Sequence, residues 1–386
     1  MRVCFVVTTP FVLNAFVAPT IRSLLQQGHS VAVVVNTRAS PISRDLLGKV
    51  EWIDLEIARS IDLSKDIHAL WKLFFRLRRE RFDIVHSVTP KAGLLAMLAA
   101  KLTSTPIRIH TFTGQVWATK RGPMRWLLRF TDRVLAQCAT VLLVDSRSQL
   151  KFLVAEKIAK PARLHVLGAG SIAGVDTTRF KPDLLARANV REHHQIPSNA
   201  LVLLYIGRMH AEKGVIELVQ AFLLLSKSHP ATHLMLVGPD EGVLGQALHV
   251  DTNLRSRIHV VSLTDQPEKY MAAADIFCLA SYREGFGLSL IEAAASELPC
   301  VASRIYGVTD AVVDGLTGLL VPVKDVDALG DALTALADQP LLRQQMGANG
   351  RARAEKDFSQ DVVVGAWLNF YQRQLLARQP ANDSTN

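Results

Sequence analysis

Short apolar stretches recur along the chain, and a segment with helical spacing follows most of them. In the first half these stretches are residues 2–9, 30–37, 83–88, 107–112 and 140–146. They are rich in Val, Ile and Leu, which is typical of strands buried on both faces of a parallel sheet. The intervening segments 18–27 and 92–102 have helical spacing. The first half therefore predicts a parallel sheet built from right-handed βαβ units.

The second half repeats this order of elements. Its apolar stretches are residues 201–207, 233–238, 258–263, 275–280, 299–303 and 318–322. A Gly-rich segment at 168–183, followed by Pro, predicts a linker. We expect an α/β protein with two doubly wound, Rossmann-like domains, 1–175 and 176–364, and a ligand cleft between the carboxyl ends of their strands. Residues 365–386 should form a C-terminal helix that packs back toward the first domain, with a disordered tail from Gln379.

The composition is that of a globular protein, with 49% hydrophobic and 20% charged residues in a chain of 386. The longest apolar runs, such as 93–100, are much shorter than the ~20 residues of a transmembrane helix. The N-terminal apolar stretch fits a first strand better than a signal peptide. Four scattered cysteines without metal-like pairing indicate a reduced, cytosolic protein.

The charge is distributed unevenly between the two halves. Residues 1–170 contain 25 Lys and Arg against 11 Asp and Glu, whereas residues 171–386 contain 19 against 24. A basic half beside a mildly acidic half indicates that the basic half meets something anionic. Nucleic acid, phospholipid and a diphosphate substrate all satisfy this condition.

The segment Tyr282–Ser303 places two carboxylates around a Gly-containing turn that leads into a helix. Residues 275–280 before it read as a buried strand, and helical spacing begins at Leu288. A helix N-terminus after a strand is a ready anion site, because its free N–H groups and its dipole face the turn. Glu284 lies in the turn, and Glu292 lies about one helical turn further on. A phosphate at the turn and a polyol held by a carboxylate together predict a sugar nucleotide.

A second loop carries two cations after a strand. Arg208 and Lys213 lie between Gly207 and Gly214. Two cations beside a diphosphate would neutralise the charge that develops on a departing nucleoside diphosphate, so such a site needs no metal. The alternative is a basic loop exposed to solvent. The twelve histidines show no metal-ligand spacing, and Asp325 or Asp327 of the Asp-Val-Asp segment reads as a helix cap rather than a metal ligand.

These motifs resemble retaining glycosyltransferases of family 4, which have the two-domain GT-B fold. The resemblance rests on residues 207–214, 238–242, 273–303 and 315–322. It implies that Arg208 and Lys213 hold the diphosphate and that Glu292 binds the ribose hydroxyls. It also implies that Glu284 lies near the donor sugar. The diphosphate cradle would be completed by the backbone N–H groups of Phe286, Gly287 and Leu288.

The first half resembles transferases that extend polyprenyl-diphosphate-linked sugars for bacterial capsule, O-antigen or related glycans. This similarity rests on residues 84–102, 107–122 and 167–180. It implies that His110, expected at the end of a strand facing the cleft, contacts the donor sugar. Lys91 would attract a phosphate of donor or acceptor. The alternative for His110 is a strand-end histidine that is hydrogen-bonded to the backbone. The alternative for Lys91 is a lysine exposed to solvent. The first loop, 8–19, lacks the Gly-Gly pair of many family members.

Two segments mix basic residues with aromatic residues and Leu. Residues 65–82 and 120–134 each have this character. Such segments suit a helix at an anionic membrane surface, while the alternative is an apolar core face with solvated charges opposite. Because the first half is basic and the implied acceptor is lipid-linked, we expect these two segments to contact a membrane.

The sequence therefore predicts a metal-independent glycosyltransferase that moves a hexose or N-acetylhexosamine from a UDP-sugar to a lipid-diphosphate-linked sugar. It would be cytoplasmic and peripheral on the inner face of the membrane. One alternative is a sugar-nucleotide epimerase or hydrolase on the same fold. The other is a basic nucleic-acid-binding or membrane-binding scaffold. Because no nucleic-acid module is recognisable, we expect no nucleic-acid partner.

Overall fold

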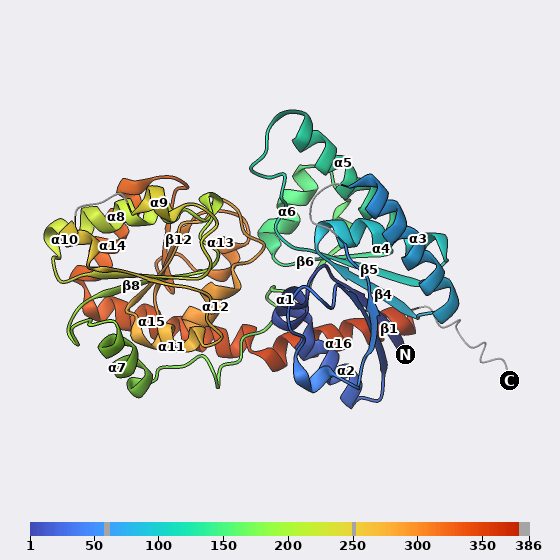
Figure 1. Cartoon of the computed structure of the whole chain (residues 1–386), viewed down its shortest axis with the longest axis horizontal. Coiled ribbons are helices and arrows are strands. Elements are labelled where there is room, and N and C mark those ends of the chain that lie inside the picture. Colours follow the sequence, from blue (N-terminus) through green and yellow to red (C-terminus); the bar gives the residue numbers. More distant parts are fainter. Residues whose placement is uncertain (58–61, 249–251, 378–386) are drawn as a thin grey trace. The chain divides into compact units, whose positions relative to one another are not determined.

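The computed structural model describes residues 1–57, 62–248 and 252–377. The tail expected from Gln379 lies outside these residues. The chain divides into two compact units (Figure 1). Unit 1 contains Met1–Gly174 together with the C-terminal segment from Gln360, and unit 2 contains Val175–Ser359.

Unit 1 is built on a seven-stranded parallel sheet with the order β3-β2-β1-β4-β5-β6-β7. Its strands are β1 (Arg2–Val6), β2 (Ser30–Val35), β3 (Glu51–Asp54), β4 (Ile84–Val88), β5 (Ile107–Phe112), β6 (Val141–Val144) and β7 (Leu164–Val166). The strands β1, β2, β4, β5 and β6 fall in the predicted stretches. The two edge strands, β3 and β7, were not predicted.

The helices of unit 1 bury apolar faces against this sheet. They are α1 (Pro10–Val12), η1 (Leu13–Val17), α2 (Ala18–Gln26), α3 (Leu63–Glu80), α4 (Pro90–Leu102), α5 (Gly122–Cys138) and α6 (Arg147–Ala155), with short 3₁₀ turns η2 (Arg44–Leu46) and η3 (Pro161–Arg163). Helix α4 contacts both α3 and α5. Asp62 caps α3 by accepting a hydrogen bond from the Lys65 N–H at 3.1 Å.

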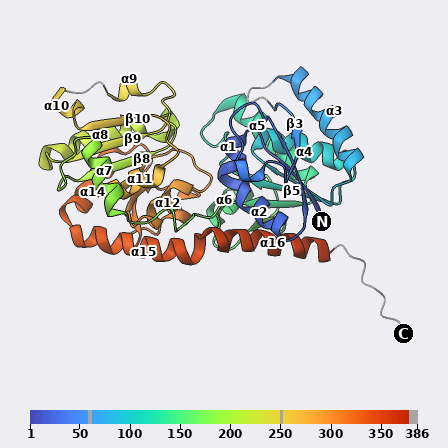
Figure 2. The ribbon, with the colours of Figure 1, turned by 60° about the horizontal axis from the view of Figure 1, so that its bottom comes forward.

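The C-terminal helix α16 (Gln360–Leu376) belongs to unit 1 and lies beside α2 (Figure 2). Its buried Trp367 stacks on His86 of β4 with ring centroids 4.8 Å apart. The Tyr371 hydroxyl lies 2.6 Å from His86 Nδ1, and the Thr111 hydroxyl lies 2.7 Å from His86 Nε2. Burial lowers the pKa of His86 to about 3, so this ring is a neutral anchor between helix and sheet.

Unit 2 has a six-stranded parallel sheet with the order β10-β9-β8-β11-β12-β13. Its strands are β8 (Val202–Ile206), β9 (His233–Val237), β10 (Ile258–Val261), β11 (Ile276–Leu279), β12 (Cys300–Ser303) and β13 (Gly318–Val321). All six fall in predicted stretches. Both sheets are Rossmann-like, as the sequence predicted.

The helices of unit 2 connect these strands. They are α7 (Leu184–His193), η4 (Ala211–Lys213), α8 (Val215–Ser228), α9 (Leu244–Ala247), α10 (Thr252–Arg255), α11 (Pro267–Ala273), α12 (Leu288–Ala295), α13 (Val308–Ala311), α14 (Val326–Asp338) and α15 (Pro340–Phe358). Asp325 caps α14 by accepting from the Ala328 N–H at 2.9 Å, which confirms the predicted cap.

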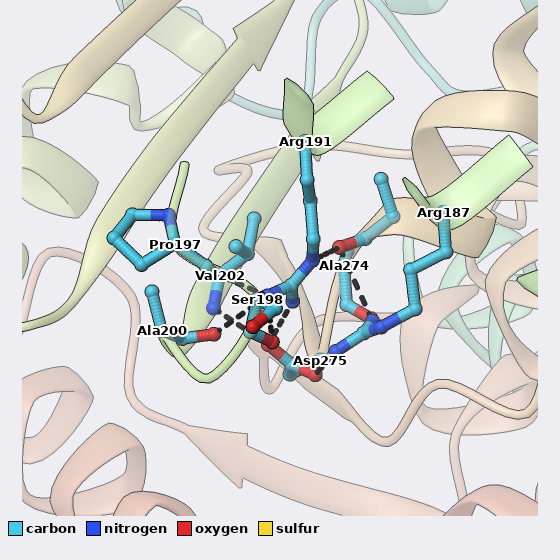
Figure 3. A network of polar contacts seen from close by, with 9 residues as sticks. Arg187, Arg191, Pro197, Ser198, Ala200, Val202, Ala274 and Asp275 are labelled. Atoms are coloured by element: carbon cyan, nitrogen blue, oxygen red, sulfur yellow. Dashed lines mark hydrogen bonds and ion pairs between the residues drawn. The ribbon is translucent and has the colours of Figure 1, made fainter. Parts of the chain in front are cut away.

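A charged network fixes the amino-terminal edge of the unit 2 sheet (Figure 3). The Asp275 carboxylate, just before β11, lies 2.7 Å from Arg187 Nη2 and 2.8 Å from Arg191 Nη2, both on α7. It also accepts the Val202 N–H at 2.7 Å. Arg191 donates further to the Ala200 carbonyl at 2.9 Å. The network joins α7, β8 and β11, and so sets the frame for the loops at the other ends of these strands.

Candidate functional site

Two loops meet at the carboxyl edge of the unit 2 sheet. One follows β8 and the other follows β11, and these strands are hydrogen-bonded neighbours. Gly214 in the first loop has φ +67°, and a Cβ there would lie 2.1 Å from the Ala280 carbonyl oxygen in the second. Only glycine permits this approach. The Tyr282 N–H also donates to the Glu212 carbonyl at 2.8 Å, so the loops are held together.

Lys213 and Glu284 form an ion pair across these loops. Lys213 Nζ lies 2.6 Å from Glu284 Oε1, and the Ser281 hydroxyl donates to the same oxygen at 2.8 Å. Both charged side chains are largely buried. Two predicted site residues, distant in sequence, are therefore in direct contact. An anionic ligand would compete with Glu284 for the lysine.

Arg208 lies in the same first loop and pairs with a carboxylate from a third loop. Its Nη1 lies 2.7 Å from both carboxylate oxygens of Glu241, which follows β9. Met209 fixes this arrangement, since its N–H donates to the Pro239 carbonyl at 2.8 Å and its carbonyl accepts the Glu241 N–H at 2.9 Å. Half of the Arg208 side chain remains exposed. Arg208 is therefore held near the edge while remaining accessible. Gly207, before it, continues the pairing with β9 by donating to Val237 at 2.9 Å.

Helix α12 begins at the second loop, as the spacing predicted. Its N-cap residue Gly287 has φ +82°, in the left-handed region that favours glycine. Phe286 is buried, with its ring 5.3 Å from that of Phe358. The N–H groups of Phe286, Gly287 and Leu288 open the helix, where no preceding turn supplies carbonyl partners. Such N–H groups and the helix dipole favour an anion in general, and this helix start follows the loop that carries Glu284.

Glu292 lies in the second turn of α12. Its side chain is half-buried, but protein atoms surround the carboxyl group closely. Burial raises the pKa of Glu292 to about 7, while Arg179 acts against the shift and Glu268 adds to it. Arg179 is itself paired with Glu268 at 2.7 Å. Within the described residues, no side chain donates a hydrogen bond to Glu292, so its carboxyl group suits the hydroxyls of a ligand.

The structure corrects the predicted position of His110. His110 does not end its strand, because β5 continues to Phe112. The ring is 1% exposed, and a Cβ on Gly93 of α4 would lie 2.3 Å from His110 Cε1. The Ser87 hydroxyl lies 2.9 Å from His110 Nδ1. Burial lowers the pKa of His110 to about 3. It is therefore a neutral residue packed beneath α4 and hydrogen-bonded to Ser87.

Lys91 is the second residue of α4, at the carboxyl edge of the unit 1 sheet. Its Nζ lies 2.6 Å from Asp66 of α3, and the side chain is mostly buried. The solvated lysine considered as an alternative is therefore wrong. A phosphate at this helix N-terminus would compete with Asp66 for the lysine.

Sequence reasoning missed the carboxylate partner of Arg208 and the hydroxyl partner of Glu284. Glu241 lies in the motif 238–242 and Ser281 directly follows the predicted strand, but a pattern along the chain does not show pairing across loops. It also missed Asp145, a buried acid at the end of β6. Its only sequence signal is an acidic residue directly after an apolar strand.

A hollow of about 250 Å³ lies at the opposite, amino-terminal edge of the unit 2 sheet. Its lining includes Arg187, Asp275 and Arg343. Both arginines already have partners, since Arg187 pairs with Asp275 and Arg343 donates to the Ala337 carbonyl at 2.9 Å. None of the predicted site residues lines it, and we assign it no ligand.

Two family models match this chain, one in each half. Residues 13–170 match the family model "Glycosyl transferase 4-like domain", and residues 186–353 match "Glycosyl transferases group 1". The chain is 30% identical to a D-inositol 3-phosphate glycosyltransferase of Kribbella flavida, over 87% of this chain and 84% of that protein. It has the fold of a sucrose-phosphate synthase from Thermosynechococcus elongatus, with a TM-score of 0.80, 22% identity and coverage of 98% and 100%.

Two further relatives have names that mention surface polysaccharides or lipid-linked sugars. A capsular polysaccharide biosynthesis glycosyltransferase of Staphylococcus aureus, CapM, is 29% identical over 80% of this chain and 81% of its own. A UDP-Gal:alpha-D-GlcNAc-diphosphoundecaprenol alpha-1,3-galactosyltransferase of Escherichia coli is 27% identical over 74% of each chain. The protein is therefore a glycosyltransferase enzyme. It belongs to the family 4-like glycosyltransferases with the GT-B fold, as the sequence motifs predicted.

Proposed function

We propose that this enzyme moves a hexose or N-acetylhexosamine from a UDP-sugar to a polyprenyl-diphosphate-linked sugar, with retention of configuration. The observation that carries the proposal is the contact between Lys213 and Glu284 beside the N-terminus of α12. It places a cation, a carboxylate and free N–H groups at the carboxyl edge of one sheet. This combination suits a diphosphate with an attached sugar.

In this proposal the donor binds to unit 2. Arg208, Lys213 and the N–H groups at the start of α12 hold the diphosphate. Glu292 accepts hydrogen bonds from the ribose hydroxyls, and Glu284 lies near the donor sugar. The two cations and the helix dipole stabilise the charge of the leaving diphosphate, so we propose that the reaction needs no metal ion or other cofactor.

The proposed transfer occurs on one face of the sugar. The bond between the anomeric carbon and the diphosphate oxygen breaks, and its electron pair stays on that oxygen. The acceptor hydroxyl oxygen bonds to the same face of the oxocarbenium-like carbon, and its proton passes to the leaving phosphate. Lys213 favours the step because negative charge increases on the phosphate that it contacts.

The acceptor is proposed from the relatives together with the chemistry of unit 1. The name of the Escherichia coli relative specifies a diphosphoundecaprenol-linked sugar, and that of the Staphylococcus aureus relative specifies capsular polysaccharide. An acceptor anchored in a membrane requires an enzyme that works at the membrane surface. We therefore place the enzyme in the cytoplasm, peripheral on the inner face of the cytoplasmic membrane.

The exposed faces of α3 and α5 support membrane contact. On α3, Trp71 is 55% exposed and Phe75 is 60% exposed, with their rings stacked 5.8 Å apart. On α5, Trp126 is 64% exposed and stacks on the exposed Phe130 at 5.7 Å. Leu73 and Leu77 are core residues. The alternative, in which the apolar residues of 65–82 pack in the core, therefore holds for only part of this segment. In the described ranges, no helix is both long and apolar enough to span a membrane.

The function is tested by incubating the full-length protein with a panel of radiolabelled nucleotide sugars and two classes of acceptor. One class is synthetic polyprenyl-diphosphate-linked monosaccharides, and the other is soluble inositol phosphate. We expect label to enter the lipid fraction from one UDP-sugar, in the presence of EDTA, with retained configuration in the product. Label that enters only inositol phosphate, or transfer that depends on an added divalent cation, would contradict the proposal.

The hydrolase alternative is separated in the same assay. Free UDP and free sugar are measured with and without lipid acceptor. We expect UDP release to increase at least tenfold when the acceptor is present, because the acceptor supplies the attacking hydroxyl. Equal release in both conditions would favour hydrolysis.

A further inference from the structure

Asp145 is a buried acid at the carboxyl edge of the unit 1 sheet. It directly follows β6, and the residue before it, Val144, pairs with Phe112 of β5. The residue after β5, Thr113, is therefore its neighbour at the edge. Asp145 is 3% exposed. In parallel α/β sheets this edge is where ligands bind.

The backbone of Asp145 is fully bonded, but its side chain is not. Its N–H donates to Gln149 Oε1 at 2.7 Å, and its carbonyl accepts the Ser171 N–H at 2.6 Å. Within the described residues, its buried Oδ1 has no hydrogen-bond partner. A buried carboxyl oxygen without a partner is costly. The fold therefore satisfies the backbone of Asp145 while leaving one polar side-chain atom without a partner.

The surroundings of Asp145 are polar and neutral. Gln149 of α6 bridges to Thr113, because its Nε2 donates to the Thr113 carbonyl at 2.9 Å, and Gln115 Nε2 donates to the same carbonyl at 2.8 Å. Ser171 contacts Asp145 from the segment after β7. The nearest charged residue along the chain, Arg147, has an exposed side chain. Amide and hydroxyl groups without a contacting cation suit sugar hydroxyls and do not suit a phosphate.

A second unpartnered polar atom lies at the same edge. Thr89 follows β4, and β4 is the other neighbour of β5. Its Oγ1 is shielded from solvent and, among the described residues, has no hydrogen-bond partner. Its φ of +78° is strained for a β-branched residue. The edge formed by β4, β5 and β6 thus has two side chains whose hydrogen bonds the protein does not itself satisfy.

We propose that the Asp145 carboxyl group binds a hydroxyl group of the acceptor sugar. The inference rests on the proposed function, in which the donor diphosphate is held by unit 2, so that the polar edge of unit 1 serves the acceptor. The segment 168–173 contacts Asp145 and includes Gly168, Gly170 and Ser171 in the left-handed region, with φ of +55°, +115° and +69°. Oδ1 is shielded from solvent in this conformation, so acceptor binding requires this segment to move. Its strained member is Ser171, because glycine adopts positive φ freely.

The protonation state gives this binding a pH signature. Burial raises the pKa of Asp145 to about 8, so the carboxyl group is mostly neutral at pH 7. A neutral carboxyl group both donates to and accepts from sugar hydroxyls, and ionisation removes the donor. Acceptor binding should therefore weaken as the pH rises through 8. The neutral fraction falls about tenfold between pH 7 and pH 9.

The test measures acceptor KM and kcat from pH 7 to 9 for the wild type, Asp145→Asn and Asp145→Leu. We expect the wild-type acceptor KM to rise about tenfold over this range, and that of Asp145→Asn to stay level, because an amide keeps a donor and cannot ionise. Asp145→Leu should raise the acceptor KM at least tenfold at pH 7 with donor KM unchanged. The matched control is Asp132→Asn, another buried acid of unit 1, whose carboxylate already accepts the Trp117 Nε1–H at 2.7 Å. Its acceptor KM should follow the wild-type pH profile.

An alkaline rise in acceptor KM that persists in Asp145→Asn overturns the inference. The inference is also overturned if folded Asp145→Leu has the same acceptor KM as the wild type. If Asp145→Leu does not fold, the pH profile of Asp145→Asn decides alone. Failure of the wild type itself to transfer sugar to any lipid-linked acceptor overturns the proposed function instead, so the two failures are distinguishable.

Discussion

Glu292 and Lys213 contribute to the donor site in different ways. Lys213 is a cation already held by a carboxylate at 2.6 Å. Glu292 is an acid whose pKa burial raises to about 7, so that near neutral pH it is only partly ionised. The first supplies charge to a leaving group, and the second supplies a hydrogen-bond acceptor for hydroxyls. The sequence indicated this edge for both residues, because Lys213 lies in the loop after one predicted strand and Glu292 in the helix that follows another.

We predict that binding of the donor favours the ionised form of Glu292, so that the carboxyl group releases a proton when the donor binds. Ribose hydroxyls donate to the ionised carboxylate, so affinity for a UDP-sugar should fall about tenfold from pH 8 to pH 6 as the carboxylate is protonated. A UDP-sugar is the correct probe, because its diphosphate diester does not titrate in this range. Titration calorimetry in buffers of different ionisation enthalpy should show proton release near pH 7.

Glu292→Gln is the matched variant for this prediction. An amide retains an acceptor oxygen but cannot ionise, so the affinity should be weaker at pH 8 and level across the range, with no proton release. A variant that keeps the full pH dependence would show that another group titrates.

His110 shows where residue-level prediction failed. The predicted strand 107–112 is observed as β5, so the error lies in placing His110 at the end of that strand rather than within it. The partner that buries the ring, Gly93, lies on α4. Burial by another element is a tertiary property, and no spacing within 107–113 encodes it.

At the scale of elements, the sequence predicted every central strand and missed the edges of unit 1. β3 reads Glu-Trp-Ile-Asp and β7 reads Leu-His-Val. Both are short and carry polar residues, because an edge strand is only partly covered. Each is a strand because it pairs with β2 or β6. The placement of α16 is equally non-local, since Tyr371 and His86 are 285 residues apart.

The network around Asp275 should stabilise unit 2 without taking part in chemistry. Asp275→Ala leaves the buried Arg191 guanidinium without its carboxylate, which should cost about 3–5 kcal/mol of unfolding free energy. Urea denaturation followed by fluorescence measures the loss. Asp338→Ala, at an exposed carboxylate that pairs with His229, should cost less than about 1 kcal/mol. Similar losses in both variants would contradict the structural role of the network.

The exposed aromatic face of α3 should bind anionic membranes. The double variant Trp71→Ser and Phe75→Ser removes two large apolar side chains from the surface, so binding to phosphatidylglycerol-rich vesicles should weaken at least tenfold. Vesicle co-sedimentation measures this, and added salt should weaken wild-type binding further. Leu341→Ser, at an exposed apolar residue of α15 in unit 2, is the control and should bind as the wild type does. Unchanged binding of the double variant would contradict membrane contact through α3.

At the scale of the whole molecule, the two units differ in charge and in the kind of group at the carboxyl edge of each sheet. Unit 2 presents Arg208, Lys213 and a helix N-terminus. The edge of unit 1 presents Asp145, Thr89 and neutral amides, together with Lys91 paired to Asp66, while its outer helices expose aromatic and basic residues. This difference fits a charged, soluble donor for one unit and a lipid-anchored sugar for the other. The identity of the donor sugar depends on side chains around a bound ligand, which neither motif spacing nor strand order specifies.

The central claim is that Lys213 stabilises the leaving diphosphate without a metal ion. It is tested most directly by kcat of Lys213→Ala at saturating UDP-sugar and acceptor in the presence of EDTA. Lys227→Ala, at an exposed lysine of α8, is the control and should keep the wild-type kcat. We predict that kcat of Lys213→Ala falls by about 100-fold or more, while the protein remains folded. A kcat near that of the wild type, or wild-type activity abolished by EDTA, would contradict the account.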